Sequence, residues 1–140
     1  MIKEIAVFIA TESGFILGDT LQVAHRTDDS PDQCSVVLES VGAGIHPDLP
    51  DKLDKMIQVI SRAETYMDAL DDALVIFNAL CGSVAGSELP LGIREILAVA
   101  PATQDYEAVI EALAGPQYIG QDEKGRYEFS TNYIFRIQNK

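Results

Sequence analysis

The side chains that could bind a metal ion gather in two short segments of the sequence. Each segment holds one histidine followed by aspartates, namely His25 with Asp28, Asp29 and Asp32, and His46 with Asp48 and Asp51. Imidazole and carboxylate groups are ligands that zinc and manganese accept. Neither spacing matches a known ligand motif, however, and aspartate is common in turns because its side chain hydrogen-bonds the local backbone. A small metal-dependent enzyme that uses His25 and the aspartate loop is therefore one hypothesis, in which His25→Ala abolishes activity.

Catalytic and cofactor motifs are missing from the rest of the sequence. It contains no P-loop, no G-x-S-x-G, no H-E-x-x-H, no C-x-x-C and no G-x-G-x-x-G. Its 22 acidic residues make chance pairs of carboxylates inevitable, so a pair alone does not indicate acid–base catalysis. Outside the hypothesis built on His25 and the aspartate loop, we therefore expect no catalytic residue, no cofactor and no bound metal.

The chain is strongly acidic, with 22 Asp and Glu against 10 Lys and Arg and a net charge of -12. Such a surface repels phosphates, which argues against nucleic-acid binding through neutralised backbone charge. Three explanations of the charge are open: solubility, a surface past which DNA must move without sticking, or mimicry of DNA itself. An acidic DNA mimic would inhibit a DNA-binding enzyme by occupying its cationic site, and it would lose that partner above ~0.5 M salt.

The elements that must position these residues follow from hydrophobic periodicity. A length of 140 residues fits one domain, assigned to residues 1–140. The predicted elements are helices at 2–12 and 63–80 and strands at 21–26, 34–41, 56–62, 106–113 and 126–137, while residues 94–100 fit a strand or a short helix. This order predicts an α+β fold, a mainly antiparallel β-sheet with two α-helices packed on one face. No run approaches the ~20 apolar residues of a membrane span, so no membrane partner is expected.

The helix predicted at 63–80 has two distinct faces. One is an apolar stripe expected to lie on the core, made of Ala63, Tyr66, Met67, Leu70, Ala73, Leu74, Phe77 and Leu80. The other carries only negative charge, from Glu64, Asp68, Asp71 and Asp72. Like charges four residues apart cost a few tenths of a kcal/mol per pair, so an unmixed face is unusual for a solvated helix. This face is either simply solvated or a functional acidic wall. Ser61 has the spacing of a helix cap, although it also fits the preceding strand.

The segment 126–137 alternates almost perfectly between two kinds of residue. The parity of Tyr127, Phe129, Thr131, Tyr133, Phe135 and Ile137 predicts the buried face of a long strand. Residues 122–125 before it predict a hairpin turn closed by glycine. The other parity begins with the polar residues Arg126, Glu128, Ser130 and Asn132. These either meet water or form a hydrogen-bonded contact with another subunit.

Three blocks of the sequence resemble phage minor capsid proteins of the tail-terminator type. The block LAGPQYIGQDEKGRYEFSTNYIFRI at 113–137 follows the family's closing pattern, P-x-Y-L-G-x-D-E-x-G-R-x-E-F-S-x-N. The block DDSPDQCSVVLESVGAG at 28–44 is similar to a loop and strand of the family, and IQVISRAETYMDALDDALVIFNAL at 57–80 to its strand and long helix. Residues 83–106 depart from the family's pattern.

The resemblance implies a phage or prophage assembly protein and no enzyme. Tail terminators of long-tailed phages form a hexameric ring on the finished tail tube, stop its polymerisation and present a surface to the head connector. The expected partners are therefore further copies of the chain, the tail tube protein and the head connector protein, while DNA passes through the pore without specific binding. The isolated chain can still be a monomer, since some rings form only on their template. Another ring protein of the head–tail junction, or neck, is the nearest alternative.

The resemblance also suggests a location and roles for particular residues. It implies the virion, at the head-proximal end of the tail, after assembly in the bacterial cytoplasm. Under it, Arg126, Glu128, Ser130 and Asn132 are candidates for contacts with other subunits or with the tube. An acidic lumen repels phosphates and keeps DNA moving. The candidates for such a lining, or for a contact with a partner, are Glu64, Asp68, Asp71, Asp72, Asp28, Asp29 and Asp32.

Overall fold

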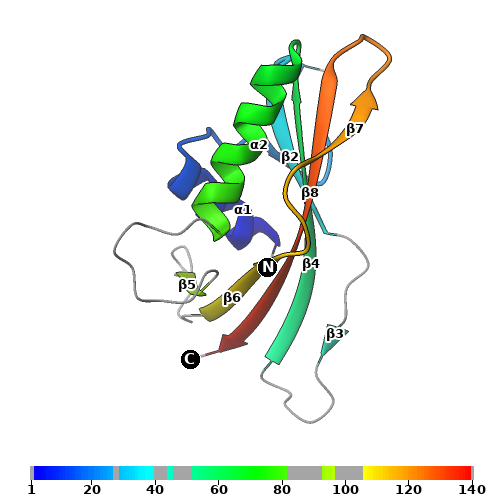
Figure 1. Ribbon diagram of the computed structural model, residues 1–140. Helices are drawn as coiled ribbons and strands as arrows, with labels where there is room; N and C mark the ends of the chain where they lie inside the picture. The colour runs from blue at the N-terminus through cyan, green and yellow to red at the C-terminus, as the bar shows by residue number, and fades with distance from the viewer. Residues whose placement is uncertain are drawn as a thin grey trace.

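Two helices and eight strands make up the part of the chain that the computed structural model describes, which is residues 2–26, 29–39, 44–45, 52–81, 93–96 and 106–139. Their order is α1 (Ile2–Ser13), β1 (Leu21–Val23), β2 (Cys34–Glu39), β3 (Gly44–Ile45), β4 (Lys52–Ala63), α2 (Tyr66–Cys81), β5 (Ile93–Ile96), β6 (Tyr106–Ala112), β7 (Gln117–Gln121) and β8 (Tyr127–Asn139). Both helices lie on the same side of one twisted sheet (Figure 1).

The sheet runs in the order β1-β2-β4-β8-β6-β5, with β3 paired to β4 and β7 paired to β8. Its pairs are antiparallel, except that β1 runs parallel to β2. The predicted α+β fold, a mainly antiparallel sheet with two α-helices on one face, is therefore confirmed. Among the described residues, neither helix is both long enough and apolar enough to cross a membrane.

The helix α1 follows the predicted pattern closely. Its residues Ile5, Ala6 and Ile9 are buried, since their spacing puts them on one side of the helix. Gly14 ends the helix with a positive φ of 80°, and its N–H donates to the carbonyl of Ala10 at 2.9 Å. Such a left-handed ending suits glycine, which lacks a Cβ.

The helix α2 is rotated relative to the prediction. The buried stripe is Ala69, Ala73, Ile76 and Leu80, whereas Met67 and Leu74, predicted to lie on the core, are 60% and 38% exposed. That part of the prediction is wrong because the helix is apolar over more than one face, so periodicity alone does not select the face that packs. The small Ala69 and Ala73 pack beside Phe129 of the sheet.

Thr65, which was not predicted as a helix cap, fixes the start of α2. The hydroxyl of Thr65 accepts a hydrogen bond from the N–H of Asp68 at 3.2 Å, which is the geometry of an N-cap. Ser61 belongs to β4 instead, and its hydroxyl lies 2.9 Å from that of Ser35. The predicted alternative, Ser61 as a strand residue, is thus the correct one.

The closing strand β8 confirms the predicted parity and forms the centre of the core. Phe129, Tyr133 and Phe135 are buried on the side of the helices, with Tyr133 opposite Ile57 of β4. Tyr133 and Phe135 pack in one apolar cluster with residues of both helices, among them Ile9 of α1. The covered face of the sheet is therefore the apolar core.

The hairpin before β8 differs from the prediction. Residues 106–112 do form a strand, but β6 pairs with the second half of β8, and the hairpin partner across the turn is β7. The strand β7 was not predicted, because Gly115, Pro116 and Gly120 are typical of a turn. Here β6 and β7 follow one another along β8, and Gly120 sits at a register shift with a φ of 121°.

The predicted hairpin turn at 122–125 is confirmed. Gly125 has a φ of 76°, and its N–H donates to the carbonyl of Asp122 at 3.0 Å. The strand β4 begins at Lys52, earlier than predicted, and β3 pairs with it.

Candidate assembly surfaces

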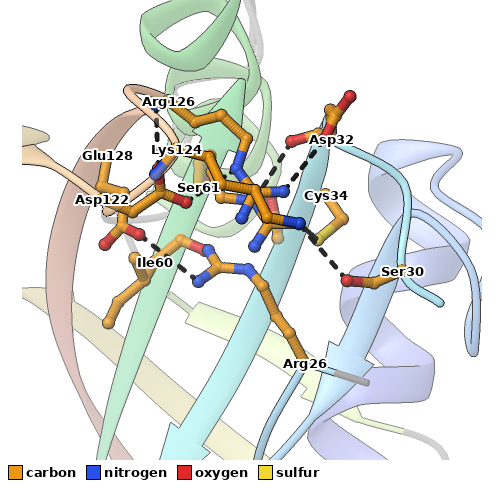
Figure 2. A network of polar contacts seen from close by, with 12 residues as sticks. Arg26, Ser30, Asp32, Cys34, Ile60, Ser61, Asp122, Lys124, Arg126 and Glu128 are labelled. Carbon is orange, nitrogen blue, oxygen red and sulfur yellow. Dashed lines mark hydrogen bonds and ion pairs between the residues drawn. The ribbon is translucent and has the colours of Figure 1, made fainter. Parts of the chain in front are cut away.

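The face of the sheet that points away from the helices, here called the open face, carries a network of charged side chains. Its residues come from alternate positions of the same strands that build the core, such as Arg62 on β4 and Glu128 on β8, which are register partners. Figure 2 shows side chains from the loop before β2, from β4 and from the β7–β8 turn converging there. Figure 1 shows that neither helix covers this side.

Arg62 fastens the loop before β2 to the sheet. Its guanidinium donates to the carbonyls of Pro31 at 2.8 Å and Asp32 at 3.1 Å, and to the Ser30 hydroxyl at 3.3 Å. It also lies 3.4 Å from the Cys34 sulfur, and Arg62 is buried. Burial lowers the pKa of Arg62, and the positive charges of Arg26 and Arg126 add to that effect. These partners are neutral, so the charge of Arg62 is solvated mainly by backbone dipoles.

Arg126 joins the β7–β8 turn to the same loop. Its Nε donates to Asp122 at 2.7 Å and its Nη1 to Asp32 at 2.9 Å. Burial alone would raise the pKa of Asp122, but hydrogen bonds from the backbone and guanidinium of Arg126 hold it below its usual value. A side-chain hydrogen bond with Glu64 and the charge of Arg126 also lower the pKa of Asp32. Residues 32 and 126 are 94 positions apart, so this ion pair ties distant parts of the chain together.

Arg26 is the least satisfied of the three arginines. Its Nη2 donates to the carbonyl of Ile60 at 2.8 Å, and its Nη1 lies 3.9 Å from a carboxylate oxygen of Glu128, which is longer than a hydrogen bond. Its Nε is buried and has no hydrogen-bond partner among the described residues. A buried donor without an acceptor costs about 1–3 kcal/mol, so the fold holds Arg26 here at a cost in stability.

The open face is hollowed beside these arginines, in a shallow depression of about 430 Å³ that we name the arginine hollow. Its lining consists of Ala24, His25, Arg26, Val36, Leu38, Ile60, Arg62, Asp122, Glu123, Lys124, Arg126 and Glu128. Four cations and three carboxylates meet there, although the whole chain has only 10 basic residues. With Asp32, which pairs with Arg126, these charges balance, so the hollow is a cluster of cations with little net charge on a strongly acidic protein.

The four residues predicted to form a subunit or tube contact have different environments. Ser130 is buried at 6% exposure, and its hydroxyl accepts a hydrogen bond from Gln58 at 2.8 Å. Arg126 and Glu128 are half-buried in the network, and Asn132 is exposed. These residues lie on the strand face opposite the core, as predicted. Ser130, Arg126 and Glu128 already contact other side chains of the same subunit. Their role in contacts with other subunits or with the tube stays a prediction.

The predicted acidic residues form one continuous feature. Glu64, Asp68 and Asp71 are exposed, and Asp72 is half-buried; we name these four residues of the α2 region the acidic wall. The loop before β2 joins this wall, because Gln33 donates to Asp72 at 2.9 Å. Burial raises the pKa of Asp72, and the charges of Asp68 and Asp71 raise it further.

The two remaining predicted acidic positions lie in the loop before β2. Asp29 is exposed, whereas Asp28 lies outside the described residues. The structure thus brings the acidic loop and the acidic helix face together, although the sequence analysis treated them as separate candidates.

An exposed aromatic patch was not predicted at all. Tyr66 at the start of α2 lies 5.4 Å from Tyr118 of β7 and 4.9 Å from Phe129, measured between ring centroids. Tyr118 and its neighbour Ile119 remain about half exposed. In the described part of the chain, β7 is hydrogen-bonded on one side, to β8. The signal was present in the sequence as apolar residues inside a segment that otherwise resembles a turn.

The metal hypothesis gains no geometric support in the described residues. No three His, Cys, Asp or Glu side chains converge there on a position that could hold a metal ion, and His25 is exposed. Of the other proposed ligands, His46, Asp48, Asp51 and Asp28 lie outside the described residues.

No curated protein matches this chain. The protein family described as "Bacteriophage tail terminator protein" matches residues 8–139, which include the second half of α1, the acidic wall and the whole open face. This match confirms the resemblance of the three sequence blocks. The chain therefore belongs to the bacteriophage tail terminator protein family, and it is a structural protein of a phage tail.

Proposed function

We propose that this protein caps the phage tail tube as a ring of identical subunits, ends tube polymerisation and forms the tail-side joint to the head connector, with a pore that conducts DNA. The observation that carries the proposal is the family match over residues 8–139, which extends over the sheet and both helices. It agrees with three separate blocks of the sequence that follow the family's pattern in order.

The charge of the molecule supports a DNA-conducting role. The helix α2 contains no lysine or arginine, and its outer surface carries Asp68 and Asp71. DNA that passes a ring must not be held by its phosphates, and cationic contacts would trap it. An acidic ring repels the phosphates and keeps transit fast. In the assembled ring, acidic side chains face the pore or a neighbouring subunit.

The surface of the protein also supports assembly with protein partners. The aromatic patch exposes Tyr66, Tyr118 and Ile119 beside an edge strand, and large exposed apolar groups of this kind gather at protein–protein contacts. We propose that the patch contributes to contacts within the tail, with the tube protein or the connector as partner.

Electron microscopy of the purified chain, with and without tail tubes, tests the proposal. We expect rings of sixfold symmetry at the ends of tubes, whether or not the chain forms rings alone. The same images would also distinguish a tail cap from a neck protein, which would sit on the connector and leave tube ends open. A chain that never binds tubes at any concentration would overturn the proposal.

A further inference from the structure

The molecule carries a cluster of cations and a cluster of carboxylates on different parts of its surface. The arginine hollow lies on the open face, and the acidic wall lies on and beside α2, which covers the other face (Figure 1). Four of the 10 basic residues of the chain line the hollow. Two copies of a chain with a net charge of -12 repel each other on average. Electrostatic attraction between them therefore requires that cations of one copy lie against anions of the other.

Arg126 is ion-paired within one copy, but among the described residues the other three cations of the hollow have no carboxylate within hydrogen-bond distance. Arg62 donates to carbonyl and hydroxyl oxygens, and Arg26 approaches the Glu128 carboxylate only to 3.9 Å. Arg26 also has a buried Nε without a partner among the described residues. The side chain of Lys124 is exposed at the rim. A carboxylate that entered the hollow would therefore meet the charges of Arg26 and Lys124 without displacing a close ion pair.

The carboxylates of the acidic wall repel one another. Asp68 and Asp72 are four residues apart on one helix, with Asp71 between them, and α2 has no cation to separate them. Such like-charge neighbours destabilise each other on a helix surface. Asp68 and Asp71 are exposed, so a cation from another molecule can reach them.

We propose that the acidic wall of one copy docks into the arginine hollow of the next copy, and that this contact repeats around the ring. The inference rests on the proposed ring, and it names the two surfaces that meet in it. Because the hollow and the wall are different patches of the same chain, the contact is heterologous. A heterologous contact joins subunits head to tail and closes into a ring when its rotation permits.

A pair of charge reversals tests this contact with the full chain. Lys124→Glu makes the hollow repel a normal wall, and Asp71→Lys makes the wall repel a normal hollow. Each side chain is exposed, so neither change should disturb folding, which circular dichroism and thermal unfolding would verify. Lys3→Glu and Glu12→Lys, both exposed on α1, change the net charge by the same amounts and serve as matched controls.

Each reversal alone should raise the concentration needed to cap tail tubes by about tenfold or more, as close interfacial charge pairs do. An equimolar mixture of the two variants should restore capping, since in alternating rings every hollow then meets a wall of opposite charge. The association should also weaken between about 0.1 M and 0.5 M salt, because screening shortens the reach of the charges.

Different results would overturn the contact between wall and hollow alone, or the capping function together with it. Variants that cap tubes as well as their α1 controls would overturn the docking of wall and hollow, while the cap itself would stand. A weakened Lys124→Glu that the Asp71→Lys partner does not rescue would also overturn it, since the hollow would then bind the tube or the connector. A wild-type chain that caps no tubes would overturn the proposed function, and this inference with it.

Discussion

Phe129 and Ser130 are neighbours on β8, both buried, yet they belong to faces of the sheet that are held in different ways. Phe129 packs against alanines of α2, whereas Ser130 accepts a hydrogen bond from Gln58. Apolar packing tolerates other residues of similar volume, because the hydrophobic effect has no direction. Hydrogen bonds and ion pairs require particular donors and acceptors in particular places. The covered face thus specifies the fold, and the open face depends on the identity of single residues.

The largest effect should come from the covered face. Phe135→Ala removes a fully buried ring from the main core cluster, so the free energy of unfolding should fall by about 3–5 kcal/mol. Its neighbour Ile134 points to the other face and is only half-buried, so Ile134→Ala should cost no more than about 2 kcal/mol. Chemical denaturation of both variants measures the difference. Equal losses in the free energy of unfolding would contradict the distinction between the two faces.

The next effect concerns Arg62 on the open face. Arg62→Met keeps much of the volume but removes the bonds to the carbonyls of Pro31 and Asp32, so unfolding should become easier by about 1–3 kcal/mol. Arg62→Lys should rescue only part, because one ammonium cannot reproduce a planar fork of donors. Hydrogen exchange of the loop before β2 should rise in Arg62→Met. A neutral or stabilising Arg62→Met would show that packing, and not directed bonding, holds this face too.

A smaller effect sharpens the comparison along a single strand. Ser130→Ala removes a buried hydroxyl and leaves Gln58 without its acceptor, at a cost of about 1 kcal/mol. Asn132→Ala changes an exposed side chain two residues away on the same face and should be within about 0.5 kcal/mol of wild type. Thermal unfolding of the two variants compares them. If Ser130→Ala changes assembly and leaves stability untouched, the residue acts at a contact and not inside the subunit.

The smallest effects should appear as opposite pH dependences of two aspartates. The pKa of Asp32 is lowered in the fold from its ordinary 3.8, so its contribution to stability is present above that value and lost as pH falls through the folded pKa. The pKa of Asp72 is raised from 3.8, so its ionised form opposes folding near neutral pH and is relieved as pH falls through the folded pKa.

Asparagine substitutions separate these two cases. At pH 7, Asp32→Asn should destabilise the chain and Asp72→Asn should stabilise it by less than about 1 kcal/mol, the effect being reduced by solvent at this half-buried site. The Asp72→Asn difference should already shrink as pH falls toward 3.8, because the folded pKa of Asp72 is raised, whereas the Asp32→Asn difference should shrink only below pH 3.8, because the folded pKa of Asp32 is lowered. Unfolding experiments at several pH values check the two signs. The same sign for both variants would contradict the described environments.

The covered face could largely be predicted from the sequence, because periodicity reports which residues share a side of a helix or strand. The parity of β8 and the ends of α1 followed directly. The rotation of α2 did not, since Met67 and Leu74 are as apolar as the residues that pack, and only the sheet beneath decides between them. The strand β7 was hidden by Gly115, Pro116 and Gly120, whose local preferences indicate a turn while pairing with β8 decides the structure.

The open face could not be predicted in the same way. Arg126 and Asp32 are 94 positions apart, and Arg62 and Pro31 are 31 apart. No local sequence pattern indicates that such distant residues lie together. In the sequence, the three arginines of this surface therefore appear as isolated charges. The acidic wall was visible because its members lie within one helix and its approach. Its counterpart on the other side of the sheet became visible only in the folded chain.

Growth of tail tubes in the presence of this protein tests the central claim most directly. Preformed tubes are incubated with the chain, labelled tube protein is then added, and electron microscopy records where label is incorporated. If the chain is a terminator, capped ends should take up no label while uncapped tubes lengthen. Continued growth through ends that carry the protein would contradict the account.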